Sequence, residues 1–430
     1  MNKILMLFAS ILISFSNSKA QNCTNGRYDT EIFSNFSITQ DIQYGSNVNF
    51  DGSNQNLLLD IYSPSGDTET ERPLIIFIHG GSFVFGSKEG TGVVPLAESF
   101  AKKGYVTSSI NYRLGMNNLV TVTGPSEADA SEAVMRATQD ARAAVRFFKK
   151  SVADDNNPYG IDTTNIYLVG SSAGGFTAIN LSFLDQTSEI PSYIDMTDPS
   201  LLGGLEGNSG NPGHTSNVKA IVSLAGAIGD TTWMDNNSTP ILSLHGDQDG
   251  TVPFGTGQIS IAIFDIMEVD GSESVHLKAD NLGIKNCFKA HYGADHVPHQ
   301  SSAAYLDTTE QYITQFLLSE VCGETEFCIC NTPLDPTPCH NGNGTNSLSF
   351  EGLSDKLLMY PNPANNEVHL ILEDYAIDKI TLLNVNGQMI YKKEFLQSNV
   401  VIDVSSFQKG IYFLYIESEG NSITKKLIIE

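Results

Sequence analysis

Short, continuous apolar runs alternate with amphipathic stretches through most of this chain. Such runs suit strands that are buried on both faces of a parallel sheet. They predict strands within 41–62 and over 74–78, 106–110, 166–169, 218–224, 241–245 and 288–292. The amphipathic stretches predict helices over 95–103, 128–152, 175–184 and 309–321. Strands that alternate with helices indicate an α/β domain with a mostly parallel sheet and helices on both faces.

Two segments interrupt this rhythm, 114–125 and 184–217, where Gly, Asn, Ser and Pro are frequent. Loops of this length inside a compact domain are usually functional. The second segment follows the helix predicted over 175–184, so we expect it to cover a site beside that helix.

The pattern changes near the end of the chain. Residues 323–354, rich in Cys, Thr, Pro, Asn and Gly, are predicted to be a linker. Beyond them lie short β-like runs at 357–360, 368–372, 379–385, 388–392, 400–404, 411–416 and 423–429. Turn signals such as Asn386-Gly387 separate the runs, so residues 355–430 predict a small all-β, Ig-like sandwich.

Residues 1–20 have the pattern of a secretory signal peptide. Lys3 supplies the positive charge, an apolar run extends from Ile4 to Phe15, and Ala20 ends a cleavage site of small residues. The run is short for a membrane span, and no later run approaches about 18 apolar residues, so no transmembrane segment is predicted. The mature chain would then begin at residue 21, with 21–322 as its large α/β domain.

Cysteine content agrees with an exported protein. The chain has six cysteines, Cys23, Cys287, Cys322, Cys328, Cys330 and Cys339. An even number in an exported chain favours disulfides, although the sequence does not select the pairing. A zinc site built on Cys328-Ile329-Cys330 and Cys339-His340 matches no common ligand spacing. We expect disulfides near the end of the large domain, with Cys23 joining the N-terminus to them.

The net charge excludes some partners. There are 24 Lys and Arg residues against 49 Asp and Glu residues, a net charge of −25. Such an acidic surface argues against nucleic acid or an anionic membrane as a partner.

The strongest chemical signal is Gly170-Ser171-Ser172-Ala173-Gly174. It lies between a predicted strand and a predicted helix, which is the context of a G-x-S-x-G nucleophile elbow. The glycines permit a sharp turn that presents Ser172 Oγ at the start of the helix. An ordinary strand-to-helix turn is the competing interpretation.

A nucleophilic serine also needs hydrogen-bond donors for the oxyanion that forms on the substrate. His79-Gly80-Gly81-Ser82-Phe83 follows the buried run 74–78, where glycines let backbone amides approach a ligand. The expected donors are the amides of Gly81 and Ser82, joined by that of Ala173. The competing interpretation is a simple glycine turn.

In enzymes with such an elbow, the acid follows the serine and the histidine follows the acid. Gly246-Asp247-Gln248-Asp249 follows the strand predicted over 241–245. Asp249 fits the H-G-x-x-D-x-x-V-P arrangement and is preferred, with Asp247 as the alternative. Asp230 and Asp235 lie one strand earlier and fit less well.

The histidine must then come late in the large domain. His276, His291, His296 and His299 satisfy this order, and His291 lies inside a predicted strand. His296 lies in a loop after that strand and is the preferred general base, with His299 as the alternative.

On these residues, 40–322 resembles the secreted α/β-hydrolase carboxylesterases and lipases. Further matches are Asn111-Tyr112-Arg113-Leu114 and the helix segment that begins at Asp140. The resemblance implies ester hydrolysis through an acyl-enzyme, with Ser172, His296 and Asp249 as the triad and with no metal or cofactor. Ser82 replaces a third glycine of many relatives, and some relatives use Glu as the acid. A serine peptidase on the same fold and an inactive, hydrolase-like adhesion protein are the alternatives.

Residues 355–430 resemble the C-terminal sorting domain of the type IX (Por) secretion system. The matching pieces are Tyr360-Pro361-Asn362-Pro363-Ala364, Val385-Asn386-Gly387-Gln388, Gly410-Ile411-Tyr412 and Lys425-Lys426-Leu427-Ile428-Ile429. The resemblance implies the secretion machinery as a partner and passage through the periplasm and outer membrane of a Gram-negative bacterium. The protein would be secreted or held at the cell surface. A carbohydrate-binding module is the competing interpretation.

The substrate class stays open at this stage. A small-molecule or polymeric ester is expected, with a lipid, an acetylated or feruloylated glycan and a polyester as the choices. Aromatic residues that either line an acyl pocket or belong to the core are Phe83, Phe85, Tyr112, Trp233 and Phe254.

Overall fold

The computed structural model describes residues 22–236, 239–261, 264–324, 328, 340–342, 357–372, 376–384, 389–418 and 421–429. The chain divides into two compact units, Met1–Gly344 and Thr345–Glu430. The predicted signal peptide, most of the predicted linker, Cys330 and Cys339 lie outside the described residues.

A nine-stranded sheet forms the centre of the first unit, in the order β1-β2-β4-β3-β5-β6-β8-β11-β12. Its strands are β1 (Phe36–Val48), β2 (Asn54–Pro64), β3 (Arg72–Ile78), β4 (Val106–Ile110), β5 (Ile161–Ser171), β6 (Ala220–Leu224), β8 (Ile241–Gly246), β11 (Asn286–His291) and β12 (His340–Gly342). The strands from β4 to β11 in this order pair in parallel, and the pairs at both edges are antiparallel. The predicted α/β class is confirmed.

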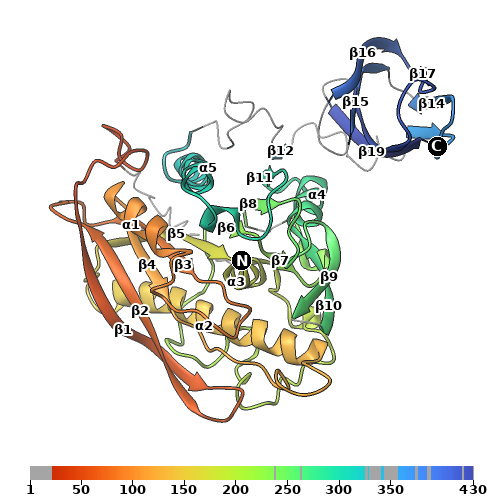
Figure 1. The fold of residues 1–430 in the computed structure, drawn as a ribbon. Helices are drawn as coiled ribbons and strands as arrows, with labels where there is room; N and C mark the ends of the chain where they lie inside the picture. Colours follow the sequence, from red (N-terminus) through yellow and green to blue (C-terminus); the bar gives the residue numbers. More distant parts are fainter. Residues whose placement is uncertain are drawn as a thin grey trace, which may run out of the picture. The chain divides into compact units, whose positions relative to one another are not determined.

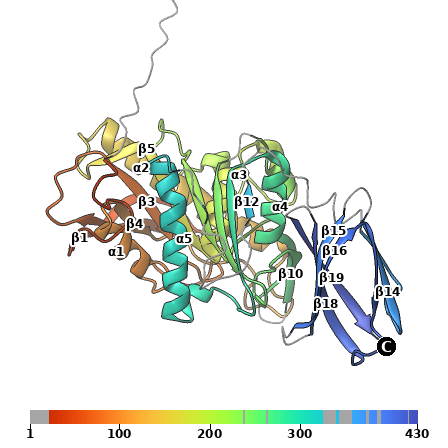
Figure 2. The same cartoon turned by 90° about the horizontal axis from the view of Figure 1, so that it is seen from above.

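The apolar runs are continuous because both faces of the sheet are covered (Figures 1 and 2). Leu74, Ile76 and Ile78 of β3 pack into the core shared with α2 and α3. Ile75 and Phe77 point to the opposite face and pack with α1 and α5. The helices are α1 (Val94–Lys102), α2 (Glu127–Ala153), α3 (Ala173–Phe183) and α5 (Ala303–Val321). Alternate side chains of one strand thus bury two separate helix layers.

Helix α2 also holds the long segment 184–217 in place. Gln139 Nε2 donates to the carbonyl oxygens of Leu201 and Gly204 at 2.9 and 2.7 Å. Arg142 donates to the carbonyl of Leu184 at 2.7 Å, and Arg146 donates to that of Gly210 at 2.9 Å. These donors satisfy backbone carbonyls that would otherwise be buried without partners. The segment contains the short 3-10 helices η1 (Thr187–Glu189) and η2 (Gly204–Glu206).

The chain between β6 and β11 forms a small additional layer that was not predicted from the sequence. It consists of β7 (Ala227–Ile228), η3 (Thr231–Trp233), β9 (Thr256–Ile261), β10 (Phe264–Gly271) and α4 (Ser272–Leu282). The three strands form a separate antiparallel sheet in the order β7-β10-β9. Val275 and Ala279 of α4 are buried in the core that α2 and α3 share. A further short 3-10 helix, η4 (Pro298–Gln300), follows β11.

Two disulfides lie in the described part of the first unit. Cys23 is bonded to Cys322, across a sequence separation of 299 residues, and Cys287 is bonded to Cys328. The expectation that Cys23 joins the N-terminus to the end of the large domain is therefore confirmed. Among the described residues, no helix combines the length and the apolar content needed to cross a membrane.

The second unit is all-β, as predicted. Its strands are β13 (Leu357–Tyr360), β14 (Glu367–Leu372), β15 (Ile377–Asn384), β16 (Met389–Gln397), β17 (Asn399–Asp403), β18 (Gly410–Ser418) and β19 (Asn421–Ile429). They form two sheets, β13-β14-β17 and β16-β15-β18-β19. Alternate residues of β14, Val368, Leu370 and Leu372, are fully buried. This period of two is typical of strands with one face in a core.

Candidate active site

The predicted site residues gather where parallel strands end. Ser172 follows β5, the glycine-rich loop His79–Phe83 follows β3, Asp249 follows β8, and His296 follows β11. Because the carboxyl ends of parallel strands meet at one edge of the sheet, these loops lie together although they are far apart in the sequence. Ligands of open α/β sheets bind at this edge.

Ser172 lies on a strained turn between β5 and α3. Its φ is 53° and its ψ is −117°, a conformation that costs free energy for any residue with a Cβ atom. A Cβ atom on Gly170 would lie 2.0 Å from the carbonyl oxygen of Gly174, and one on Gly174 would lie 2.0 Å from that of Ile78. Both glycines are therefore required by the close packing of this turn.

The structure brings the preferred serine, histidine and aspartate into one hydrogen-bonded chain. His296 Nε2 lies 2.9 Å from Ser172 Oγ, and His296 Nδ1 lies 2.7 Å from Asp249 Oδ2. Ser172 and His296 are partly exposed, whereas the side chain of Asp249 is fully buried. The three residues are thus ordered from the solvent side into the protein.

The buried carboxylate of Asp249 is surrounded by donors. Burial by itself would raise its pKa, but hydrogen bonds from His245 and His296 outweigh burial and hold the pKa of Asp249 well below its usual range. The amides of Thr251 and Val252 both donate to Oδ1 at 2.8 Å. Asp249 therefore stays ionised at neutral pH and accepts from the Nδ1–H of His296.

His245 is a further residue in contact with Asp249 that was not predicted from the sequence. Its Nε2 lies 3.1 Å from Asp249 Oδ2, the same oxygen that faces His296, and its Nδ1 lies 2.8 Å from Ser272 Oγ. His245 is fully buried. The H-G-x-x-D arrangement contains this histidine, but the order serine, acid, histidine favours only histidines that follow the acid.

The alternative candidates occupy other positions. Asp247 Oδ1 accepts from the amide of Gly293 at 2.5 Å, which ties the loop after β8 to the loop after β11. His299 faces Ser171 rather than Ser172, with Nε2 3.2 Å from Ser171 Oγ. Burial lowers the pKa of His299 to about 4. Among the described residues, neither Asp247 nor His299 forms a hydrogen bond to Ser172 or His296.

The backbone of the loop after β3 is also strained, and hydrogen bonds within the loop fix its path. Gly81, Ser82 and Phe83 have φ values of 117°, 53° and 61°. The amides of Val84 and Phe85 donate to the carbonyl oxygen of Gly81 at 2.9 Å. No hydrogen bond between described residues uses the amides of Gly81, Ser82 or Ala173.

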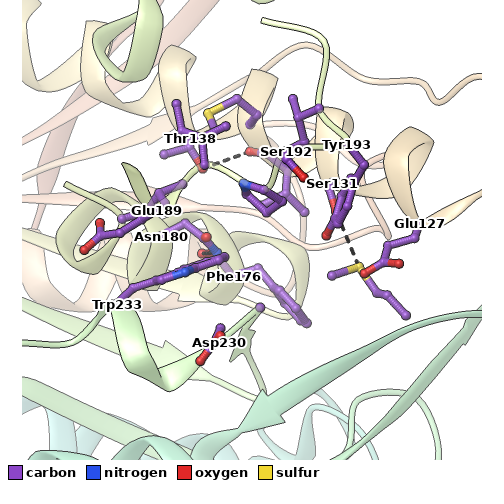
Figure 3. Close-up of a pocket in the computed structure, with 18 of the residues that line it drawn as sticks. Glu127, Ser131, Thr138, Phe176, Asn180, Glu189, Ser192, Tyr193, Asp230 and Trp233 are labelled. Atoms are coloured by element: carbon purple, nitrogen blue, oxygen red, sulfur yellow. Dashed lines mark hydrogen bonds between the residues drawn. The ribbon is translucent and has the colours of Figure 1, made fainter. Parts of the chain in front are cut away.

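A cavity of about 600 Å³ lies beside the elbow helix (Figure 3). Its lining comes from the first turns of α2, from α3, from residues 188–194, from the turn around η3 and from β10. Phe176 joins the cavity to the elbow, because its amide donates to the carbonyl of Ser172 at 3.0 Å and its ring packs edge-on against Phe83. The long segment 184–217 thus supplies one wall of this cavity.

The aromatic residues that were considered for an acyl pocket have different locations in the structure. Trp233 lines the cavity, and Phe85 is 69% exposed in the loop after β3. Phe83 and Tyr112 are buried, and Tyr112 Oη donates to the carbonyl of His79 at 3.0 Å. Phe254 packs against His245 and Phe288. Phe83, Tyr112 and Phe254 therefore support the loops rather than line the cavity.

No metal site accompanies this arrangement in the part of the chain that the structure describes, where no group of three His, Cys, Asp or Glu side chains is placed to hold an ion.

Two family models match the chain. Residues 59–260 match the model of the BD-FAE family, and residues 358–430 match the secretion system C-terminal sorting domain. The first match contains the loop after β3, the elbow and Asp249, and ends before His296. The chain thus contains one region similar to the BD-FAE family and one region similar to this sorting domain.

Curated proteins similar to this chain include esterases and a lipase. Esterase-5B of Drosophila persimilis is 30% identical over 125 residues, which is 29% of this chain and 21% of that protein. Gut esterase 1 of Caenorhabditis briggsae is 28% identical, over 35% of this chain and 25% of that protein. The human bile salt-activated lipase is 32% identical, over 32% of this chain and 17% of that protein. The chain therefore spans a quarter or less of the length of these relatives.

Solved structures similar to this chain include esterase 2 of Thermogutta terrifontis. Its paraoxon-phosphorylated form is 20% identical, with a TM-score of 0.46, over 67% of this chain and 95% of that chain. The propionate-bound form has the same values.

Proposed function

We propose that this protein is an exported serine carboxylic ester hydrolase that works through an acyl-enzyme on Ser172. The observation that carries the proposal is the unbroken chain from Ser172 Oγ through His296 to Asp249, at 2.9 and 2.7 Å. These distances lie within the range for a nucleophile and its general base. The esterase and lipase relatives support the same reaction class.

In the proposed mechanism, His296 Nε2 accepts the hydroxyl proton while Ser172 Oγ attacks the ester carbonyl carbon. The ester C–O bond then breaks, and His296 returns the proton to the departing alcohol oxygen. A water molecule repeats the sequence, releases the carboxylic acid and regenerates the serine. Asp249 remains a carboxylate throughout and stabilises the imidazolium ring that forms between these steps.

The carbonyl oxygen carries negative charge in both tetrahedral intermediates. We assign its stabilisation to the amides of Gly81, Ser82 and Ala173, which have no other partner among the described residues. Amides held in a fixed loop are effective because they need no reorganisation as the charge develops. The positive φ values of Gly81 and Ser82 support a loop shaped for this purpose.

The sorting domain over 358–430 indicates the route of export, through the type IX secretion machinery of a Gram-negative bacterium. The two disulfides agree with an oxidising compartment. We infer that the enzyme acts outside the cell, either released or at the surface, on a small-molecule or polymeric ester.

The test is hydrolysis of p-nitrophenyl acetate and butyrate by wild type and two serine variants. Ser172→Ala should lower kcat by roughly 10⁶-fold, because the covalent step is lost. Ser171→Ala is the matched control, since it removes the neighbouring hydroxyl from the same turn, and its kcat should stay within about tenfold of wild type. Equal rates for wild type and Ser172→Ala would refute the triad. Turnover of peptide anilides without ester turnover would indicate a peptidase instead.

A further inference from the structure

His245 lies near the end of β8 and is fully buried, so it has no access to a substrate. Its Nε2 atom faces two acceptors, Asp249 Oδ2 at 3.1 Å and the carbonyl oxygen of Val252 at 3.2 Å. Two acceptors at one ring nitrogen assign the proton to that nitrogen, because an unprotonated nitrogen would face two oxygen lone pairs. His245 therefore donates from Nε2 to the carboxylate of Asp249.

Ser272 holds the other side of the same ring. Its hydroxyl lies 2.8 Å from His245 Nδ1, at the first residue of α4, and the residue is fully buried. With the proton on Nε2, the neutral ring accepts at Nδ1, so the Ser272 hydroxyl donates to it. The carbonyl oxygen of Gly226 lies farther from this hydroxyl, at 3.5 Å. The tautomer of His245 is thus set by groups on both sides of the ring.

The carboxylate of Asp249 receives four hydrogen bonds, which matches the capacity of its two oxygens. Oδ1 accepts from the amides of Thr251 and Val252, whereas Oδ2 accepts from the rings of His245 and His296. Two donors on one oxygen share its charge, so the bond from His245 limits how strongly Oδ2 stabilises a charged His296 ring. The same bond helps to fix the direction in which the carboxylate faces His296.

We propose that His245 is a positioning residue of the triad, which orients the Asp249 carboxylate and, held by Ser272, sets the charge that Oδ2 offers to His296. The proposal rests on the proposed function, because it concerns the same hydrolase site. Without the bond from His245, Oδ2 would serve His296 alone, and the His296 ring would take up a proton at a higher pH. A protonated ring cannot accept the proton of Ser172, so activity would be lost earlier as pH falls.

Other titratable groups lie on the elements around this chain of contacts, and substitutions of His245 or Ser272 leave them in place. They are Asp247, Asp270, Glu273, His291, Asp295 and His299. Asp295 is bonded to the backbone of His296, because its Oδ1 accepts from the His296 amide at 2.7 Å. Its charge therefore acts in the same way on the wild type and on the variants.

The test measures kcat/KM for p-nitrophenyl butyrate as a function of pH. His245→Leu keeps a side chain of similar size and removes the donor, so the acid limb of the profile should move up by about one pH unit and kcat should fall by about tenfold. His245→Gln keeps an N–H group that can reach Asp249, and it should restore most of both values. The midpoint of the limb does not depend on the amount of folded protein, so a purely structural loss cannot imitate the shift.

Two serines of α4 provide a milder variant and its matched control. Ser272→Ala removes the donor at Nδ1 and makes the N–H of His245 a weaker donor, so the limb should move up by about half a pH unit. Ser274→Ala should leave the limb in place, since Ser274 Oγ contacts Thr256 Oγ at 2.9 Å. An unmoved limb in both His245→Leu and Ser272→Ala, with turnover still dependent on Ser172, would overturn the inference and leave the proposed function intact.

A second readout needs no turnover. NMR of ring-labelled histidine in a Ser172→Ala background follows the titration of His296, which is assigned by comparison with His296→Gln. Adding His245→Leu should raise the midpoint of this titration by about one pH unit, and an unchanged midpoint would overturn the inference. A raised midpoint in a protein whose wild type hydrolyses no ester would instead overturn the proposed function alone.

Discussion

Two consecutive serines at the end of β5 each face a histidine, yet their surroundings differ. Ser172 Oγ lies 2.9 Å from His296 Nε2, and Ser171 Oγ lies 3.2 Å from His299 Nε2. The first pair is partly exposed and has Asp249 behind its histidine. The second pair is buried, and Gln300 Nε2 donates to Ser171 at 3.2 Å.

The difference shows that a serine–histidine contact is insufficient for nucleophilic catalysis. Residues that follow one another at a strand end point in different directions, so only one of the two hydroxyls can reach the edge of the sheet where ligands bind. Only His296 has a carboxylate that fixes its tautomer and stabilises its charged form. The buried pair instead joins the elbow to η4.

The largest expected effect on kcat comes from replacing His296 and His299 with alanine, one at a time. His296→Ala should lower kcat for p-nitrophenyl butyrate by roughly 10⁶-fold, because no other side chain takes the proton. His299→Ala should cost stability, since Ser171 Oγ loses its contact with His299 and keeps that with Gln300, but kcat of the folded fraction should remain within about tenfold. Comparable losses of kcat in both variants, after correction for folding, would mean that the two pairs act as one unit.

A smaller difference in kcat is expected between variants of Asp249 and Asp247. Asp249→Asn should lower kcat by roughly 10⁴-fold, because an amide no longer holds the His296 tautomer that accepts from Ser172. Asp247→Asn alters the hydrogen bonds from the Gly293 amide and from Gln248 Nε2, so kcat should fall by about tenfold at most. Steady-state rates at neutral pH measure both values, and the reverse ranking would make Asp247 the acid.

The smallest expected effect is on the pH dependence of stability, through the buried pair Ser171 and His299. Burial lowers the pKa of His299 to about 4, against about 6.5 in the unfolded chain. Between these values the unfolded chain binds about one more proton than the folded protein, so this group makes stability fall as pH falls from about 6.5 to about 4.

His299→Gln should therefore flatten the decline of Tm across this window, measured by thermal unfolding at a series of pH values. Above about pH 7 the curves of wild type and variant should run parallel, since the histidine is neutral in both states there. Identical slopes below about pH 6.5 would show that His299 titrates normally in the folded protein.

The sequence predicted the strands that are buried on both faces, because a continuous apolar run such as 74–78 has few other stable locations. It did not predict β9, β10 and α4, which form a peripheral layer. Thr256–Ile261 and Phe264–Gly271 pair only with each other and with the two residues of β7, and this environment imposes no strong apolar pattern.

The candidate site was likewise only partly predictable from the sequence. Chain order and strand ends were enough to select Ser172, Asp249 and His296, which the structure brings together. The choice between His296 and His299 rests on the path of the loop after β11, which places them beside different serines. Such a path depends on tertiary packing and has no local sequence pattern.

The bond between Cys23 and Cys322 has a consequence for biosynthesis. Cys322 directly follows α5, so this bond can close only after the chain has been synthesised through α5. Cys287 precedes Cys322 in the chain, so in the unfolded chain it competes with Cys322 for Cys23. Burial of Cys287 within β11 removes that partner once the strand has joined the sheet. Formation of β11 thus protects Cys287 from pairing with Cys23 in place of Cys322.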